Sequence, residues 1–147
     1  FKVLTLWQQM PKRRASTEAH LAVARSSWAL GLADQAREFY DKVLRGGVPG
    51  SDAGNITLSR GIIEFQEGRY QVAALFAQRA TELLPADSPL HADALGLWGN
   101  ALLETGGFVE ALPKFEEAVN HAHPQHLPDF RIGAARCLMR LSRWDEA

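Results

Sequence analysis

The residues of this chain best suited to chemistry are three histidines within six positions of one another. The segment HAHPQH contains His121, His123 and His126, and neutral imidazoles are good ligands for zinc, copper or nickel. Their spacing differs from the usual two-histidine arrangement on a helix, no cysteine is nearby, and Asp129 is the only close carboxylate. We therefore interpret the segment as a polar turn between helices and expect no metal or other cofactor. Metal binding by the cluster stays open as the alternative.

Other reactive residues give weaker indications. Lys12, Arg13 and Arg14 form a basic run, which we interpret as a solvated turn, with contact to an acidic partner or a lipid surface as the alternative. The single cysteine, Cys137, excludes an intrachain disulfide and a CxxC site, and we expect it to be buried and inert. Neither a GxSxG nor a GxxxxGK motif occurs, so we expect no enzyme.

Bulk composition limits the function further. The 147 residues carry 16 Lys and Arg against 17 Asp and Glu, a balance that argues against a nucleic-acid-binding protein. No apolar run approaches the roughly 18 residues that cross a bilayer, so we expect no membrane span. The cytoplasm is the expected compartment, with the periplasm as the alternative. Because the chain begins without Met and stops where a helix is expected, we interpret it as a fragment of a longer protein.

These residues are positioned by an internal repeat. A glycine is followed five residues later by an alanine in GLADQA, GRYQVA and GGFVEA, and a fourth copy, SRWDEA, has Ser142 in place of the glycine. The alanines are Ala36, Ala73, Ala111 and Ala147, so the period is 36 to 38 residues. Such self-similarity is the sequence signature of stacked helical units.

A second small-residue column lies seven positions before each anchor, and proline closes each unit. The small residues, at which two helices can approach closely, are Ala24, Gly61, Gly99 and Ala135; the prolines are Pro49, Pro85 and Pro124. The pattern predicts first helices at 17–30, 54–67, 91–104 and 128–141, and second helices at 34–45, 70–83 and 108–121. Ser88 or Asp87 before Pro89 is a good helix start, and the stretch from Gly46 to Gly54 is expected to be a long turn.

Taken together, the small residue, the Gly, the Ala, an aromatic or Ala and the closing Pro resemble the tetratricopeptide repeat family. The resemblance covers nearly the whole chain and implies an all-α, right-handed α-α superhelix. We expect one array over residues 1–147: the end of a preceding repeat at 1–12, full repeats at 17–49, 54–85 and 92–124, and a truncated fourth at 128–147. The period exceeds the usual 34 residues, and most of the family's aromatics early in the first helix are missing.

The resemblance implies that first helices line a concave groove. Carried over place by place, the expected partner-binding residues are Leu21, Arg25, Trp28, Leu58, Ile62, Phe65, Asn100, Leu103, Arg136, Met139 and Arg140, within a wider set that includes Asp93, Gly96, Glu104 and Ile132. Apolar anchors dominate binding energy at interfaces, and arginines can orient a peptide backbone or carboxylate. For Trp28, Phe65 and Met139, packing between repeats is an equal alternative. Trp98, Leu102, Phe115 and Leu138 are expected in the core.

A known subclass of the family grips a chaperone's terminal carboxylate with lysines and asparagines. Only fragments of that pattern occur here, in Arg25, Asn55 and Asn100, and no expected groove position holds a lysine. We therefore expect a scaffold that binds a protein or peptide partner and has no catalytic residues of its own. The alternatives are a substrate-recruiting domain of a larger enzyme, such as a transferase, and an envelope assembly or secretion component. The oligomeric state is left open.

Overall fold

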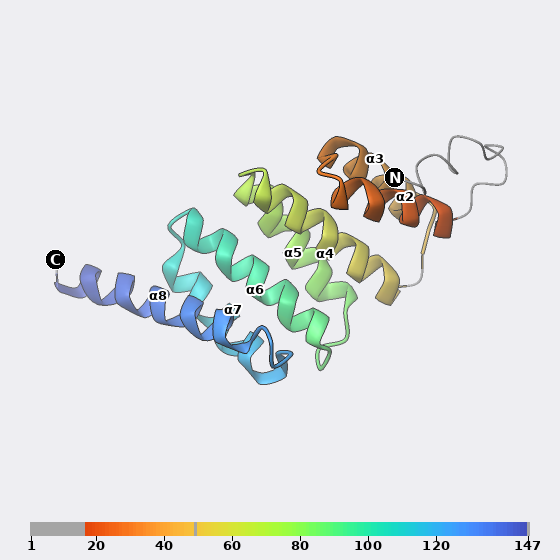
Figure 1. The fold of residues 1–147 in the computed structure, drawn as a ribbon. Coiled ribbons are helices and arrows are strands. Elements are labelled where there is room, and N and C mark those ends of the chain that lie inside the picture. Colours follow the sequence, from red (N-terminus) through yellow and green to blue (C-terminus); the bar gives the residue numbers. More distant parts are fainter. Residues whose placement is uncertain (1–16, 49, 147) are drawn as a thin grey trace. The chain divides into compact units, whose positions relative to one another are not determined.

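The chain folds into helical pairs (Figure 1). The computed structural model describes residues 17–48 and 50–146, with side chains described up to Ser142 except that of Ser51. The helices are α2 (Thr17–Ala29), α3 (Ala33–Arg45), α4 (Gly50–Gln66), α5 (Tyr70–Leu83), α6 (Pro89–Glu104), α7 (Phe108–His121) and α8 (Leu127–Glu146). They belong to two compact units, Phe1–Pro49 and Gly50–Ala147, which are described separately below. The expected end of a preceding repeat at 1–12 and the basic run at 12–14 lie outside the described residues.

The all-α prediction is confirmed, since no strand occurs between residues 17 and 48 or between 50 and 146. The second helices expected at 34–45, 70–83 and 108–121 are α3, α5 and α7, within one residue at each end. Each second helix packs on the first helix before it, and α6 and α8 also pack on α5 and α7. The division of the whole chain into one array of repeats remains a prediction.

The anchor glycines end the first helices. Gly31, Gly68 and Gly106 all have positive φ, at 77°, 81° and 85°, a conformation that residues with a Cβ rarely adopt. In the last of these turns, the Gly106 N–H donates to Leu103 O at 3.2 Å and the Gly107 N–H donates to Leu102 O at 2.8 Å. These are the two hydrogen bonds of a Schellman motif, which satisfies the free carbonyls of a helix end. Glycine therefore recurs at the start of each anchor because the helix ends there in a conformation that favours glycine.

The start of α6 is fixed by a side-chain cap, as the sequence predicts. Ser88 lies in extended conformation before Pro89, and its hydroxyl accepts hydrogen bonds from the N–H groups of Leu90 at 3.1 Å and His91 at 3.2 Å. Proline is tolerated in the first turn because its missing N–H would have no helical partner there. The helix begins at Pro89, two residues earlier than expected.

The expected long turn up to Gly54 is wrong, because α4 already begins at Gly50. Asp52 lies in its first turn, where a negative charge is stabilised by the helix dipole. Gly54 is therefore inside the helix, where it serves packing: a Cβ there would lie 2.7 Å from Leu84 Cγ. A glycine that permits close approach was mistaken for a glycine that forms a turn.

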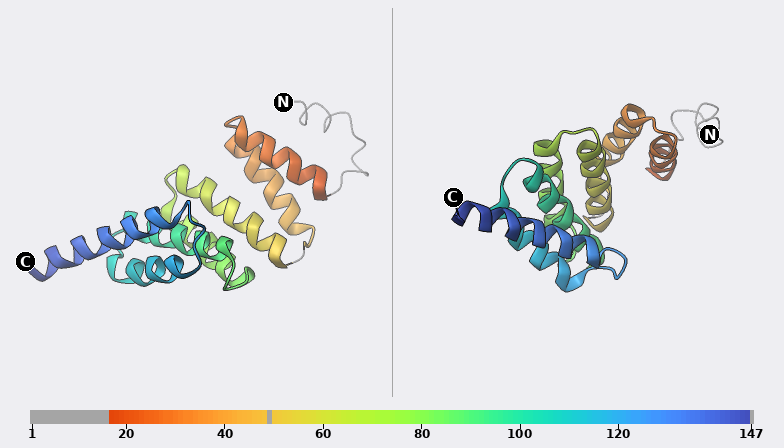
Figure 2. Two further views of the ribbon diagram at one scale, coloured as in Figure 1. Left: turned by 60° about the horizontal axis from the view of Figure 1, so that its bottom comes forward. Right: turned by 60° about the vertical axis from the view of Figure 1, so that its left-hand side comes forward.

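The end of the last first helix was also predicted wrongly. The expected boundary was residue 141, but α8 continues to Glu146, and Figure 2 shows its final turns running past α7. Ser142 occupies the position at which the other repeats have a positive-φ glycine. Because the left-handed conformation is unfavourable for a residue with a Cβ, the turn does not form and the helix continues.

The first unit has a small core between α2 and α3. Its buried residues include Val23, Ala24, Ala36, Phe39 and Val43. Ala24, a member of the small-residue column, is fully buried, as the predicted close approach of the two helices requires.

In the second unit, Phe115 of α7 fills the space beside two first helices. A Cβ on Gly99 of α6 would lie 2.8 Å from Phe115 Cζ, and one on Gly133 of α8 would lie 2.4 Å from Phe115 Cε1. The ring is fully buried, as predicted. In α8 the glycine that faces the ring is therefore Gly133, and Ala135, the expected member of the small-residue column, is exposed.

The expected core residues are otherwise placed as follows. Trp98 and Leu102 are half-buried against the core clusters. Leu138 is 53% exposed, so its assignment to the core is wrong. Among the described helices, α8 contacts only α6 and α7, and neither of them covers the Leu138 side chain.

The second unit curves toward its first helices. Helix α4 contacts α6 and α6 contacts α8, whereas α5 and α7 do not contact each other. Figure 1 accordingly shows α4, α6 and α8 side by side, with α5 and α7 behind them. The first helices therefore line the concave side of this unit, as the resemblance implies.

Candidate functional site

The candidate site is an open cleft at one end of the concave side, between the end of α6 and the middle of α8. Its volume is about 300 Å³, and it is lined by Leu103, Glu104, Gly106, Phe108, Arg136 and Arg140. Three of these, Leu103, Arg136 and Arg140, are among the residues expected to bind a partner. They come from two first helices more than 30 positions apart in the sequence, so the superhelical stacking brings them together.

The turn at Gly106 shapes the cleft. Leu103, which is 8% exposed, forms its floor, and the positive φ of Gly106 ends α6 just beyond it. The turn then places Phe108 at the start of α7, and the Arg140 guanidinium lies over its ring at 5.6 Å from the centroid. Such a cation–π contact holds the long arginine side chain against the cleft wall.

The residues that line the cleft carry a net positive charge. Arg136 and Arg140 are both exposed and lie one turn apart on α8, with Glu104 as the only carboxylate in the lining. Within the described part of the chain, no salt bridge joins either arginine to a carboxylate. A guanidinium group carries N–H donors in a fork that matches a carboxylate or a backbone carbonyl.

Other expected groove residues of the second unit differ in exposure. Met139 is 57% exposed and Ile132 is 56% exposed. Ile62 and Phe65 are half-buried against a core cluster, and the Phe65 ring packs edge-on to Tyr70, with centroids 5.1 Å apart. Phe65 therefore packs partly inside the unit, whereas the Met139 side chain is mostly exposed.

Two expected contact residues are core residues. Leu58 is 4% exposed and belongs to the cluster between α4, α5 and α6, and Leu103 belongs to the next cluster. Neighbouring helices cover most of each side chain. They support the concave surface from below and offer little area to a partner. Asn100 is half-buried.

The expected residues of the first unit lie on α2. Arg25 is exposed, and Leu21 and Trp28 are half-buried. All three remain predicted contact residues of that unit.

Two residues of the cleft, Gly106 and Phe108, were not assigned to binding from the sequence, and Phe108 is the one with a side chain. Its position in the repeat, shared with Tyr70, indicates packing between helices, and Phe108 does pack against the core cluster. Phe108 is the first residue of a second helix, and the following first helix, α8, places the long side chain of Arg140 over its ring. This contact makes Phe108 part of the cleft, and the repeat pattern alone does not indicate it.

The opposite end of the α6–α8 contact is closed by the α7–α8 turn. His126 Nδ1 lies 2.7 Å from Asp93 Oδ1 of α6, and Phe130 packs so closely on Gly96 that a Cβ there would lie 2.1 Å from its ring. Asp93 and Gly96 were expected in the groove. In the structure, His126 of the turn contacts Asp93 and Phe130 of α8 packs on Gly96.

The histidine cluster is split by the structure. His123 and His126 lie with ring centroids 6.0 Å apart, while His121 is exposed at the end of α7. In the described residues, no group of three or more His, Cys, Asp or Glu side chains is arranged to hold a metal ion.

Cys137 is fully buried in the core cluster of α6, α7 and α8, as expected. Burial raises the pKa of its thiol, with Arg136 opposing that effect, and a protonated thiol is a poor nucleophile. Separately, none of the described helices combines the length and apolar character required to cross a membrane.

Solved structures similar to this chain share its fold. MamA MSR-1 superimposes with a TM-score of 0.74 at 19% sequence identity, covering 99% of this chain and 78% of that protein. YrrB, a tetratricopeptide repeat protein with an unusual peptide-binding site, gives 0.72 at 20% identity and covers 90% of this chain, which spans 64% of YrrB. The N-terminal domain of stress-induced protein-1 from C. elegans gives 0.66 at 15% identity, with coverages of 84% and 98%.

The sequence comparison identifies the family. No curated protein matches the chain. The family model described as tetratricopeptide repeat matches residues 21–88 and 97–147, which together make up most of the chain and include all the complete anchors. Proteins of this kind are generally non-catalytic scaffolds. With its glycine turns, its stacked helical pairs and this match, the chain belongs to the tetratricopeptide repeat family.

Proposed function

We propose that the concave side of residues 50–146 binds a segment of another polypeptide, with the cleft between α6 and α8 as its main contact. The observation that carries this proposal is the cleft itself: an open volume of about 300 Å³ with an apolar floor of Leu103 and Phe108 and two exposed arginines, Arg136 and Arg140, at its rim. A partner side chain would enter over Leu103 and Phe108. Arg136 and Arg140 would bind its backbone carbonyls or a carboxylate.

The surface beside the cleft supports the same proposal. Met139 and Ile132 are more than half exposed on α8, and methionine and arginine are among the residue types enriched at protein–protein interfaces. The fold adds a general reason, because stacked helical repeats present extended concave surfaces for binding. The role proposed here is that of a scaffold, and no described residue is assigned a catalytic part.

A displayed library of random linear peptides, selected against the chain, would test the proposal. The selected peptides are then measured by fluorescence anisotropy against a variant with Arg136→Gln, Met139→Ala and Arg140→Gln. All three side chains are exposed, so we expect unchanged helicity and an affinity loss of at least about tenfold, since each lost interface contact costs on the order of 1 kcal/mol.

The matched control is on the opposite side of the unit. Leu75 is 66% exposed and Arg79 is exposed on α5, so Leu75→Ala with Arg79→Gln removes similar groups from a second helix. We expect this variant to bind as the parent does. Equal losses in both variants, or none in the first, would contradict the proposal.

A further inference from the structure

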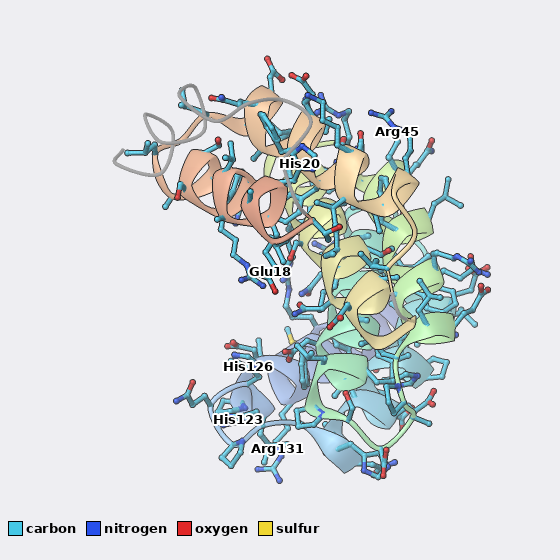
Figure 3. The ribbon with its side chains drawn as sticks, turned by 90° about the vertical axis from the view of Figure 1, so that its right-hand side faces the viewer. Glu18, His20, Arg45, His123, His126 and Arg131 are labelled. Carbon is cyan, nitrogen blue, oxygen red and sulfur yellow. The ribbon has the colours of Figure 1, made fainter. Side chains whose placement is uncertain are left out.

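We infer that the α7–α8 turn is a binding site for a divalent transition-metal ion, held by the imidazoles of His123 and His126. The site is separate from the cleft and does not depend on the proposed peptide binding. Figure 3 shows both histidines at this turn, together with Arg131 of the first turns of α8. The proposal rests on three features of the turn: the orientation of His126, the distance between the two rings, and the rigidity of the backbone between them.

The first feature is the carboxylate behind His126. Asp93 Oδ1 lies 2.7 Å from His126 Nδ1 although the residues are 33 positions apart. A carboxylate at this distance accepts the Nδ1 proton, which fixes the tautomer and leaves the Nε2 lone pair for a ligand. Histidines that bind metals almost always have such a partner on the other ring nitrogen, which raises their basicity and sets the ring orientation. The sequence alone did not reveal this pairing.

The second feature is the distance between the rings. The centroids of His123 and His126 are 6.0 Å apart, with an interplanar angle of 51°. A metal–nitrogen bond of about 2.0–2.1 Å places each ring centre roughly 3.2 Å from the ion. With a tetrahedral or a right-angled arrangement at the ion, the two ring centres would be roughly 5.2 or 4.5 Å apart. The observed 6.0 Å therefore becomes a two-imidazole site if side-chain rotation brings the rings roughly 1 Å closer.

The third feature is the backbone. The His126 N–H donates to His123 O at 2.8 Å, and the Leu127 N–H donates to the same oxygen at 3.2 Å. The Phe130 N–H then donates to His126 O at 3.2 Å, which joins the turn to α8. These bonds fix the backbone spacing between the two histidines, so little backbone conformational entropy would be lost when an ion binds.

The ligand set indicates which ion fits. His123 Nδ1 accepts a long hydrogen bond of 3.3 Å from the Gln125 N–H. Coordination through Nε2 would move the ring proton to Nδ1 and lose that bond. Two imidazoles leave the remaining coordination positions to water, so affinity depends mainly on the strength of each metal–nitrogen bond. Copper(II) forms the strongest such bonds among divalent first-row ions, and we expect it to bind more tightly than nickel(II) or zinc(II).

The test titrates the chain with copper(II) by calorimetry and electron paramagnetic resonance. We expect one strong site per chain, with hyperfine splitting from two nitrogens. His123→Ala and His126→Ala should each weaken binding by at least tenfold and leave one nitrogen in the spectrum. His121→Ala is the matched control, because His121 lies in the same segment but outside the pair, and its affinity should change by less than twofold.

Asp93 is a positioning residue, and its variants test the orientation argument. Asp93→Asn should weaken copper binding by about tenfold, the usual effect of losing such a partner, while helicity and the metal-free melting temperature identify any folding defect. Asp93→Glu keeps the carboxylate and should retain most of the affinity. The proposal is overturned if the double variant His123→Ala, His126→Ala binds copper as the parent does, or if His121→Ala weakens binding as much as His126→Ala.

Discussion

The two ends of the α6–α8 contact differ, although the same pair of helices forms both. At the end near the α7–α8 turn, Asp93 pairs with His126 and Phe130 covers Gly96. At the other end, the helices leave a cleft of about 300 Å³ beside Arg136. One end is closed by residues that reach across from the next repeat, and the other is left open.

The difference follows from the side chains at corresponding positions. Near the turn, α6 offers a glycine and a short acidic residue, so the next first helix can approach and fill the space. Near the cleft, α6 ends in Leu103 and Glu104, and α8 presents long arginines that remain at the surface. Single residues of α6 and α8 therefore close one part of the concave side and leave another part open, without any change of fold.

The largest predicted effect concerns the closed end. Phe130 is 6% exposed and packs in the core cluster of α6, α7 and α8, so Phe130→Ala should lower the free energy of unfolding by about 3–5 kcal/mol. Urea denaturation measures the loss. Phe108 at the open end is half-buried and serves as the comparison. Phe108→Ala should lower the free energy of unfolding clearly less than Phe130→Ala does. Equal losses would mean that the two ends are equally packed.

A second prediction separates close packing from backbone conformation. A Cβ at Gly96 would lie 2.1 Å from the buried Phe130 ring. Gly96→Ala should therefore lower the free energy of unfolding by about 1–2 kcal/mol, although alanine favours the helix. At the open end, Gly106 has a φ of 85° and no atom within 4 Å of its Cβ position. Gly106→Ala should therefore lower the free energy of unfolding by a similar amount, about 1–2 kcal/mol, through backbone strain alone.

Two further variants distinguish those causes in the same urea experiment. Phe130→Leu, which shortens the side chain, should reduce the effect of Gly96→Ala but leave that of Gly106→Ala unchanged. Gly106→Asn should be milder than Gly106→Ala, because asparagine tolerates the left-handed conformation better. If Phe130→Leu relieved both glycine variants, the assignment of one to packing and the other to conformation would be wrong.

The smallest predicted effect is at the start of α6. The Ser88 hydroxyl accepts two hydrogen bonds from backbone N–H groups, so Ser88→Ala should lower the free energy of unfolding by about 1 kcal/mol. Thermal denaturation followed by circular dichroism measures it. Ser88→Asp restores an acceptor and should recover most of the loss. A larger loss than that of Gly96→Ala would show that the cap, rather than packing, dominates this end.

The repeat was predictable because its cause is local. Gly31, Gly68 and Gly106 recur since each first helix needs a residue at positive φ to end it, and such a need leaves a regular trace in the sequence. Gly54 permits close packing against Leu84 and does not form a turn, so the predicted start of α4 was wrong. Ser142 replaces the turn glycine of the other repeats, so the predicted end of α8 was wrong. A repeat alignment alone does not distinguish turn glycines from packing glycines.

The candidate site was predicted only in part. Leu103, Arg136 and Arg140 follow from their places in the repeat, and the structure brings them to one cleft. The pairing of Asp93 with His126 could not be foreseen, because it joins residues of different repeats through a turn whose length departs from the usual period. Contacts of this kind depend on how neighbouring repeats dock, and no local pattern records them.

The position of Phe115 has a consequence for cooperativity. Its ring contacts Gly99 of its own repeat and Gly133 of the next, so one side chain contributes both to the intrinsic stability of a repeat and to its coupling with the neighbour. In a one-dimensional description of repeat proteins these are separate energy terms. Here they share the same atoms, so the α6–α7 pair and α8 cannot be stabilised independently of each other at this point. Helices α6, α7 and α8 should therefore exchange their amide hydrogens as one unit.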